Sequence, residues 1–534
     1  MSEERPMSAA PSGFSLTDQN GQTRVFPTGR PSLIAFLKED CNTCNLVAQI
    51  LEAFHQAWGD QADIWVLGQS KDGNQILQDR HGLTLPVLDD SALKTSFAWG
   101  FEIVPAVYWL HAEGQGGPCI EGFVRAEWQA LAQQISADLK ASDCGVVWAD
   151  LPDWRPGCGS KHLDPEIHDR LLAEADNSPI RARRIEIASS DDLDEFMFDQ
   201  GFSDGLPLVP PTPERVLRML SGTQRGSQEI VAVVPPNMAP ATVEKVAINA
   251  VMAGCRPEYL PVVIAALEAV CTDEFNMHGV TATTMGASPV LVINGPIRQR
   301  LGMNMKLGAL GPDNRANATI GRALRLIIRN VGGAKPGGVD RSTLSTPMKF
   351  TMCFPEWEEG SPWEPLHVER GFAPSDSVVT AFAMTSGPVQ IVDQESRQPD
   401  QIAGTLGLGL EGMFLSKIHR MPVDALLVVC PEHIKTLLSD GPYSKARLRD
   451  RIQEVTRRPL RDMVANEISG AGIPLASAAK MTEAQLDMLV PKFSSDQHIH
   501  IVVAGSEAGK FSAAFHGWVT GPAGSVSVSR KIEC

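Results

Sequence analysis

The sequence has no long hydrophobic run and no excess of basic residues. No apolar run approaches the roughly 18 residues that are needed to cross a bilayer, so we expect no membrane-spanning segment. Acidic residues outnumber basic ones by 63 to 47, which gives a formal net charge of −16. Such a charge repels phosphate backbones, and no basic stripe with interleaved aromatic residues offsets the repulsion. Neither a membrane nor a nucleic acid is therefore an expected partner.

The sequence also lacks a secretory signal and a dense set of cysteines. Residues 1–13, MSEERPMSAAPSG, are polar and contain no apolar core of the kind that secretion requires. We expect a flexible tail here and a cytoplasmic protein. The chain has only ten cysteines in 534 residues. In a reducing compartment most of them would be free thiols, so a close pair indicates catalysis or metal binding rather than a structural cross-link.

The length of the chain predicts two or three domains, because one hydrophobic core stops growing near 250 to 300 residues. Strand-like apolar runs alternate with helix-like runs along the whole sequence, which favours an α/β fold class. We expect a first domain over 14–140, a connector over 141–202 and a large α/β domain over 203–534. A division of the large domain into two similar halves near Phe372 remains open.

The first domain begins with a pattern that is typical of a βαβ unit. Ser32 to Leu37, SLIAFL, is a short apolar run that suits a buried strand. Apolar residues then recur at helical spacing from Leu46 to Trp58, and a second strand-like run, ADIWVLG, follows from Ala62 to Gly68. Strand, helix and strand in this order predict parallel pairing with a right-handed crossover.

Two cysteines, Cys41 and Cys44, lie where the first strand gives way to the helix. A thiolate at a helix N-terminus is stabilised by unpaired N–H groups, which lowers its pKa. Cys44, one turn further on, is placed to attack a mixed disulfide on Cys41. The charge of Asp40 opposes thiolate formation. A zinc site needs a second ligand pair, which does not follow nearby, and a purely structural role is the remaining alternative.

The strand SLIAFL leading to Cys41-Asn-Thr-Cys44, together with Ile103-Val-Pro-Ala-Val, resembles the thioredoxin-like proteins, nearest to redoxin and TlpA-like members. The resemblance covers about a quarter of the chain. It implies that Cys41 is the attacking thiol, that Cys44 resolves, and that Pro105 is a cis-proline facing them. The implied partner is a cellular thiol reductant or a disulfide. Asn42-Thr43 departs from the usual Gly-Pro, so no reduction potential is implied.

The connector contains a second group of thiol and imidazole side chains. Cys158 and His162 are close in sequence, and Cys144 precedes them. Such residues can bind zinc, but their spacing matches no standard zinc template. A thiol in a glycine turn beside solvated histidines is the simpler interpretation. No cofactor is therefore predicted, and zinc at Cys158 and His162 stays an alternative.

The remainder is similar to a poorly characterised bacterial family that is sometimes fused to a thioredoxin-like domain. The resemblance rests on the stretches "AGCRPEYLPVV", "GPDNRANATIGRALRLI" and "SPWEPLHVERGF". It implies no reaction, so candidate sites in this region come from residue chemistry alone.

Three stretches of the large domain carry candidate site residues. An arginine beside a cysteine can lower the pKa of the thiol, polar groups ahead of a helix can bind an anion, and a His/Glu loop can supply acid/base groups. The residues are, in that order, Cys255 and Arg256; Asp313, Asn314 and Arg315; and His367 and Glu369. Each stretch has a plainer interpretation, as an apolar filler, a helix cap or a packing loop.

These patterns favour a cytoplasmic thiol–disulfide oxidoreductase. In this hypothesis Cys41 and Cys44 serve a substrate or thiol held by the α/β domain, and Cys158, Cys255 or Cys534 accepts electrons. One alternative is a non-redox lyase or hydrolase of a small anionic substrate, which uses Arg315, His367 and Glu369 and has the first domain as a docking module. A redox sensor or scaffold is a further alternative.

Overall fold

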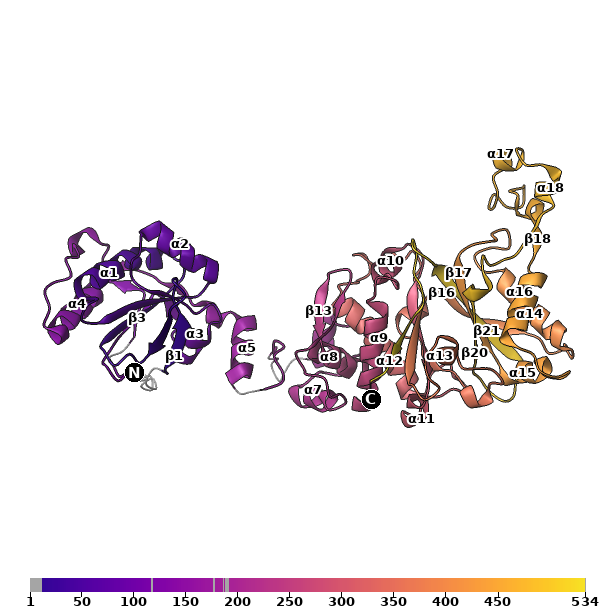
Figure 1. Ribbon diagram of the computed structural model, residues 1–534, viewed down its shortest axis with the longest axis horizontal. Coiled ribbons are helices and arrows are strands. Elements are labelled where there is room, and N and C mark those ends of the chain that lie inside the picture. The colour runs from indigo at the N-terminus through magenta and orange to yellow at the C-terminus, as the bar shows by residue number, and fades with distance from the viewer. Residues whose placement is uncertain (1–11, 117–118, 176–177, 186, 188–191, 534) are drawn as a thin grey trace. The chain divides into compact units, whose positions relative to one another are not determined.

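The computed structural model describes residues 12–116, 119–175, 178–185, 187 and 192–533. The tail predicted over 1–13 lies almost wholly outside these residues, as does Cys534. The chain divides into two compact units, Met1–Ile185 and Glu186–Cys534 (Figure 1). No helix in the described ranges is long and apolar enough to span a membrane.

The first unit is built on a five-stranded sheet in the order β5-β4-β3-β7-β8. β3 pairs in parallel with β4 and antiparallel with β7, and the remaining pairs continue the sheet on either side. The strands are β3 Ser32–Leu37, β4 Asp63–Gly68, β5 Val87–Asp89, β7 Ala106–Leu110 and β8 Ile120–Glu121. The predicted βαβ unit is thereby confirmed.

Helices and short strands complete the first unit. The helix predicted after the cysteines is α1, Asn42–Trp58, whose buried side chains recur at helical spacing. The other elements are α2 Lys71–His81, α3 Lys94–Trp99, α4 Arg125–Leu139, and the hairpin β1 Phe14–Thr17 with β2 Thr23–Phe26. Phe14, Phe26 and Phe36 surround Trp99 at ring distances of 5.2–6.0 Å, which closes one end of the core.

Part of the expected connector belongs to the first unit. β10, Trp154–Arg155, pairs with β9, Phe123–Val124, and β11, Cys158–Gly159, pairs with β6, Ile103–Val104. Residues 154–159, here called the strap, therefore run along two short strands of that unit. The helix α5, Pro165–Ala175, follows. A two-residue strand has no periodic pattern, which is why the sequence placed the end of the domain near residue 140.

The second unit has one mixed sheet of seven strands in the order β15-β14-β16-β21-β17-β20, with β22 paired to β16. Side chains of successive residues enter two different cores: Leu426 and Val428 enter one, whereas Ala425, Leu427 and Val429 enter the other. The sheet is therefore covered on both faces, as alternation along a strand requires. The strands are β14 Ser288–Asn294, β15 Cys353–Pro355, β16 Val378–Val392, β17 Val423–Val429, β20 Ile499–Val503, β21 Phe511–Val519 and β22 Val528–Lys531.

The two halves of this sheet have the same connectivity. In the first half β14 lies between a parallel β15 and an antiparallel β16, and in the second half β17 lies between a parallel β20 and an antiparallel β21. β16 and β21 join the halves by antiparallel pairing. Because the two halves have the same connectivity, the boundary between them lies after β16, between Val392 and Val423, rather than near Phe372. Both halves share one sheet and do not form separate domains.

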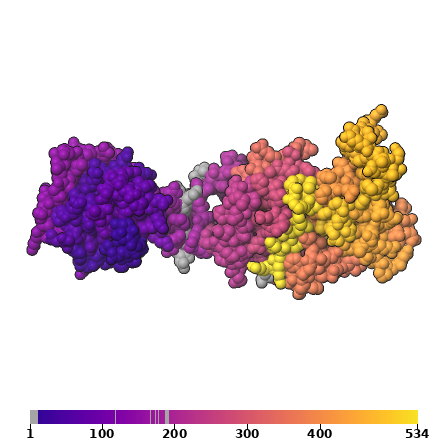
Figure 2. Space-filling model, turned by 45° about the horizontal axis from the view of Figure 1, so that its top comes forward, coloured from indigo at the N-terminus to yellow at the C-terminus, as the bar shows by residue number. Residues whose placement is uncertain are grey.

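Helices flank the sheet, and a small lobe extends from it. The main helices are α8 Val243–Ala253, α9 Leu260–Val270, α12 Arg315–Asn330, α14 Pro399–Glu411, α15 Pro431–Leu437 and α16 Lys445–Val455. The shorter elements are α6 Leu193–Asp199, α7 Pro213–Leu220, β12 Ile230–Val234, β13 Ala239–Thr242, α10 Met277–Ala282, α11 Ile297–Arg300 and α13 Leu366–Glu369. In Figures 1 and 2 the segment with β18 Arg458–Pro459, α17 Leu475–Ala478, α18 Glu483–Leu486 and β19 Leu489–Val490 stands out from the rest of the unit.

Candidate active site

Cys41 occupies the N-cap position of α1, as its place in the sequence predicts. Its backbone is extended, and its sulfur accepts a hydrogen bond from the backbone N–H of Cys44 at 3.3 Å. The sulfur also lies 3.7 Å from the carbonyl oxygen of Val104. Both cysteines have 0% of their surface exposed. The sulfur of Cys41 is thus buried and accepts a hydrogen bond from the first turn of α1.

The two thiols are electrostatically unequal. The side-chain hydrogen bond from Cys44, with help from the Cys44 backbone N–H, lowers the pKa of Cys41 to about 5 against the opposing effect of burial. Burial and the neighbouring Cys41 charge raise the pKa of Cys44 well above its usual value. Asp40 forms an ion pair with Lys38, whose Nζ lies 3.5 Å from Asp40 Oδ1. At neutral pH Cys41 is therefore a thiolate and Cys44 a protonated donor.

Pro105 has the geometry that the resemblance implies. The peptide bond between Val104 and Pro105 is cis. It lies between β6 and β7, directly after the carbonyl that contacts Cys41. The loop that carries the cis-proline therefore borders the reactive sulfur.

A third thiol, Cys158, belongs to the same site. In the strap, Cys158 pairs with Val104, the residue whose carbonyl contacts Cys41. The Cys158 thiol donates a hydrogen bond to Cys41 and contributes to lowering the pKa of Cys41. Burial and the Cys41 charge raise the pKa of Cys158 itself. The strap is further held by Thr43, whose hydroxyl donates to the carbonyl of Pro156 at 2.5 Å.

His162, which the sequence paired with Cys158 as zinc ligands, has other contacts. Its Nδ1 lies 2.7 Å from the hydroxyl oxygen of Ser160, and its ring meets Phe101 edge-on at 5.2 Å. Burial lowers the pKa of His162 to about 4. Within the described ranges, no three His, Cys, Asp or Glu side chains are grouped as metal ligands. The structure therefore associates Cys158 with Cys41, and His162 with the hydrophobic core.

Cys255 does not have the reactive environment that its arginine neighbour suggested. The thiol is buried and donates to the carbonyl of Thr319 at 3.4 Å. Burial raises the pKa of Cys255 to about 12, the opposite of the expected direction. Arg256 is exposed, so its charge does not counter the desolvation of the thiol.

The stretch around Asp313, Asn314 and Arg315 caps and anchors α12. Asn314 Oδ1 accepts a hydrogen bond from the N–H of Asn317 at 3.0 Å, and its amide group donates to the carbonyl of Gly302. Arg315 Nε donates to the carbonyl of Gly254 at 2.8 Å. Asp313 is exposed with φ of +82°. These contacts correspond to the plainer interpretation, a helix cap.

His367 and Glu369 lie two residues apart on α13 but have different surroundings. His367 is fully buried, with Nδ1 3.8 Å from Glu358 Oε1, and burial lowers its pKa. Glu369 bridges Lys445 Nζ at 2.6 Å and Arg449 Nη2 at 3.0 Å. Arg315, His367 and Glu369 thus have three different sets of partners, namely Gly254, Glu358, and Lys445 with Arg449.

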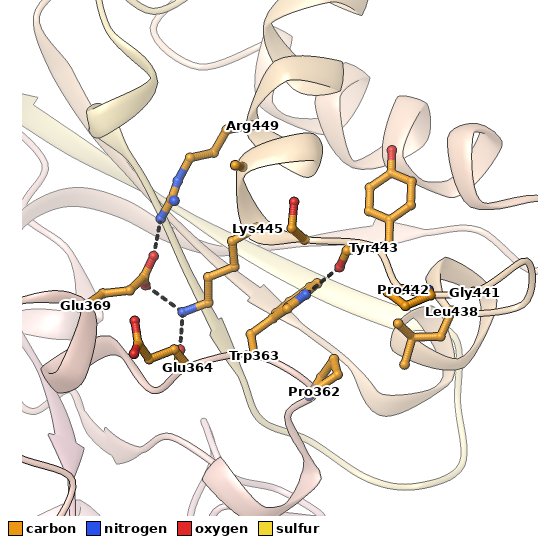
Figure 3. Close-up of a pocket in the computed structure, with 12 residues that line it drawn as sticks. Pro362, Trp363, Glu364, Glu369, Leu438, Gly441, Pro442, Tyr443, Lys445 and Arg449 are labelled. Atoms are coloured by element: carbon orange, nitrogen blue, oxygen red, sulfur yellow. Dashed lines mark hydrogen bonds and ion pairs between the residues drawn. The ribbon is translucent and has the colours of Figure 1, made fainter.

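Glu369 lines an open groove of about 780 Å³ between the 362–369 loop and the α15–α16 region (Figure 3). In Figure 3 the Lys445 and Arg449 side chains point to Glu369, and Lys445 also donates to the carbonyl of Glu364 at 2.8 Å. Trp363 donates to the carbonyl of Tyr443 at 2.6 Å. The central acid and bases of the groove are thus paired with one another.

A Cys–His pair that the sequence interpretation missed lies at the end of β17. Burial raises the pKa of Cys430, but a hydrogen bond with His433 outweighs it, so the Cys430 pKa is lowered. Although burial opposes it, the same bond raises the pKa of His433. The hydroxyl of Ser512 lies 2.7 Å from His433 Nδ1, and His433 Nε2 donates to the carbonyl of Asp393. The available signal was Cys-x-x-His directly after an apolar strand.

A basic pocket of about 210 Å³ was also missed, and it is lined by Arg325, Arg329 and Lys349. Lys349 is paired with Asp340 at 2.6 Å. The other acid of the pocket, Asp204, forms a two-pronged ion pair with Arg322. Neither Arg325 nor Arg329 forms an ion pair among the described residues, although the charges of Asp340 and Asp204 act on Arg325.

No protein-family model matches the sequence, and no curated protein matches it either. Among solved structures, the chain is similar to StoA from Bacillus subtilis, at 19% identity over 23% of this chain and 96% of that chain, with a TM-score of 0.21. It is also similar to a secreted Mycobacterium tuberculosis disulfide oxidoreductase homologous to E. coli DsbE, at 16% identity over 23% and 95%, with a TM-score of 0.21. A third is the Xanthomonas campestris bacterioferritin comigratory protein, at 14% identity over 24% and 92%, with a TM-score of 0.22.

These likenesses span only about a quarter of the chain, so the fold is assigned from its own elements. In the first unit a βαβ unit is followed by an antiparallel pair, β7 and β8, and by α4. The thiol pair begins α1, and the cis-proline precedes β7. The first unit therefore has a thioredoxin-like fold within a chain of the α/β class.

Proposed function

We propose that the chain is a thiol–disulfide oxidoreductase in which Cys41 is the attacking thiol and Cys44 the resolving thiol. The observation that supports this most directly is the pair of hydrogen bonds from Cys44 to the Cys41 sulfur, which lower the pKa of Cys41 to about 5. A thiolate is the reactive form in exchange, and a low pKa also makes Cys41 a good leaving group. The proposed partners are a cellular thiol reductant and a disulfide.

The proposed thiol–disulfide exchange needs no redox group other than the two cysteines and the substrate disulfide. The Cys41 thiolate attacks a substrate disulfide, forms a mixed disulfide and releases one substrate thiolate. Cys44 then loses its proton to the released thiolate and attacks Cys41 Sγ. The products are a Cys41–Cys44 disulfide, one substrate thiol and one substrate thiolate, so the substrate is reduced by two electrons and the protein is oxidised by two.

The test is disulfide mapping of the full-length protein after exposure to oxidised glutathione. We expect a Cys41–Cys44 disulfide in the wild type and, in C44S, a disulfide that joins Cys41 to another thiol, either glutathione or a second cysteine of the chain. Cys41→Ser should form neither. The redox proposal is wrong if Cys41 in the wild type stays fully alkylatable after oxidation, while circular dichroism shows a native fold.

We further propose that the second unit binds a small anion in the pocket lined by Arg325 and Arg329. Arg325 is only 8% exposed, and burial lowers its pKa to about 10, which reflects the cost of a desolvated charge. Its Nε donates to the carbonyl of Lys349 at 3.2 Å. The buried Nε of Arg329 has no hydrogen-bond partner among the described residues. Guanidinium groups bind carboxylate or phosphate oxygens in pairs, which would satisfy both arginines.

This proposal is tested by thermal unfolding of the full chain with inorganic phosphate or succinate, at constant ionic strength set with chloride. Ligand binding to the native state raises Tm. We expect at least one of the two anions to raise Tm in the wild type but not in Arg329→Gln. The exposed Arg300→Gln is the matched control and should behave as the wild type. Absence of a shift with both anions, or an equal shift in Arg329→Gln, would contradict the proposal.

A further inference from the structure

The reactive sulfur of the first unit is buried in the structure. Cys41 and Cys44 are both 0% exposed, and the strap runs beside them. Gly157 packs so tightly on β6 that an added Cβ would lie 2.5 Å from the carbonyl oxygen of Val104. A thiol or disulfide in solution therefore reaches Cys41 directly only when the strap is displaced.

The strap is anchored on its C-terminal side by buried and charged groups. Gln69, 3% exposed, donates to the hydroxyl of Ser160 at 2.6 Å and accepts from the N–H of Lys161 at 3.1 Å. Lys161 Nζ also lies 3.0 Å from Glu39 Oε1. The strap is thus a docked part of the unit rather than a loose loop.

The thiols of Cys41, Cys44 and Cys158 differ in their exposure to solvent. Cys158 is partly exposed, whereas the two cysteines of α1 are buried. Its backbone pairs with Val104, whose carbonyl oxygen lies 3.7 Å from Cys41 Sγ. Cys158 therefore lies beside the reactive sulfur and is partly exposed at the surface.

We propose that Cys158 is a third redox residue, which carries the disulfide from the buried Cys41–Cys44 pair to the surface. This inference rests on the proposed redox function. The Cys158 thiolate attacks Cys41 Sγ of the Cys41–Cys44 disulfide, a Cys41–Cys158 disulfide forms, and Cys44 leaves as a thiolate that takes up the proton. The step is an isomerisation with no net oxidation.

The surface disulfide is then open to an external thiol. A thiolate attacks Cys158 Sγ, and Cys41 leaves as a stabilised thiolate, since thiols of low pKa leave faster. A second external thiol attacks the sulfur of the first and releases Cys158. Two thiols are thereby oxidised to one disulfide, and the protein disulfide is reduced to two thiols. The expected external partner is a small thiol such as glutathione, because only the partly exposed Cys158 needs to be reached.

The first measurement is disulfide mapping of Cys44→Ser after oxidation with oxidised glutathione. Trypsin cleaves at Lys71 and Lys140, which separates the peptides of Cys41 and Cys158, and fragment spectra distinguish Cys158 from Cys144. We expect a Cys41–Cys158 disulfide in this variant. If Cys41 carries glutathione and Cys158 remains free, the relay is wrong although the redox function of Cys41 stands. If Cys41 is not oxidised at all, the proposed function itself fails.

The second measurement is the rate at which reduced glutathione reduces the oxidised full-length protein. Cys158→Ser should slow this reduction at least tenfold while it leaves the Cys41–Cys44 disulfide able to form. Cys119→Ser is the matched control, since Cys119 is a partly exposed thiol of the same unit, and its rate should equal that of the wild type. Equal rates for Cys158→Ser and the wild type would overturn the relay.

Discussion

The backbone N–H of Cys44 lies 3.3 Å from Cys41 Sγ, and the thiol of Cys44 donates to the same sulfur. A substitution that removes only the thiol of Cys44 separates the effects of these two donors on the pKa of Cys41. We expect Cys44→Ala to raise the pKa of Cys41 by about 1 to 2 units, since a hydrogen bond to a charged group contributes about 1.5–3 kcal/mol. Cys44→Ser retains a donor and should have a smaller effect. Thiolate absorbance at 240 nm against pH, with Cys41→Ser as blank, measures both, and an unchanged midpoint in Cys44→Ala would contradict this account.

The strap offers a matched pair of glycines for testing access to Cys41. An added Cβ at Gly157 would meet Ile103 and the carbonyl of Val104, whereas at Gly159 it would have nothing within 4 Å. Overpacking costs about 1–3 kcal/mol, so Gly157→Ala should displace the strap. We expect N-ethylmaleimide to modify Cys41 about tenfold faster, the factor that corresponds to 1.4 kcal/mol. Gly159→Ala should react like the wild type. Equal rates in both variants would show that the strap does not cover the thiol.

The Glu369–Lys445 ion pair in the groove should matter for stability because Lys445 is largely buried. The two side chains lie 2.6 Å apart, with the lysine side chain 6% exposed. Glu369→Gln leaves this charge without its acid, and we expect a loss of roughly 3 kcal/mol in the free energy of unfolding. Glu454→Gln breaks the exposed pair with Arg451 and should cost less than about 1 kcal/mol. Urea unfolding compares the two, and similar losses would contradict the expectation.

Asp424 should make the second unit sensitive to acid. Burial raises the pKa of this carboxyl, but a hydrogen bond from His498 at 3.0 Å and the nearby imidazole of His500, 3.4 Å away, outweigh it and hold the pKa at about 2. The folded-state pKa is thus below the unfolded value near 3.9, so its stabilisation is present above about pH 4 and is lost as pH falls toward 2. We expect Asp424→Asn to be less stable by about 2 kcal/mol at pH 6, with a difference that shrinks below pH 4. Urea titrations across this range measure it, and a constant difference would refute the assignment.

Local patterns predicted the first unit well. Helical spacing from Leu46 to Trp58 gave α1, and the run SLIAFL gave β3 with the same bounds as in the structure. The position of Cys41 at the helix start was also predicted correctly, and the cis bond before Pro105 is present as the resemblance implied. Each of these features depends on residues within a few positions of one another.

The predictions that differ from the structure depend on distant contacts. Cys158 meets Cys41 through a two-residue strand, which leaves no pattern in the sequence. Cys255 has a neighbouring arginine in sequence, but burial in the fold decides its pKa. His433 and Ser512 lie 79 residues apart and meet only because β17 pairs with β21.

The sequence by itself determined the thiol pair, its helix, the α/β class and the absence of long apolar runs, because these follow from composition and short-range periodicity. Only the tertiary structure decided which charges are paired, which thiols are buried and that the strap places Cys158 beside Cys41. The physical reason is that burial and hydrogen bonding depend on groups brought together over long separations, and these set the pKa and the access of each side chain.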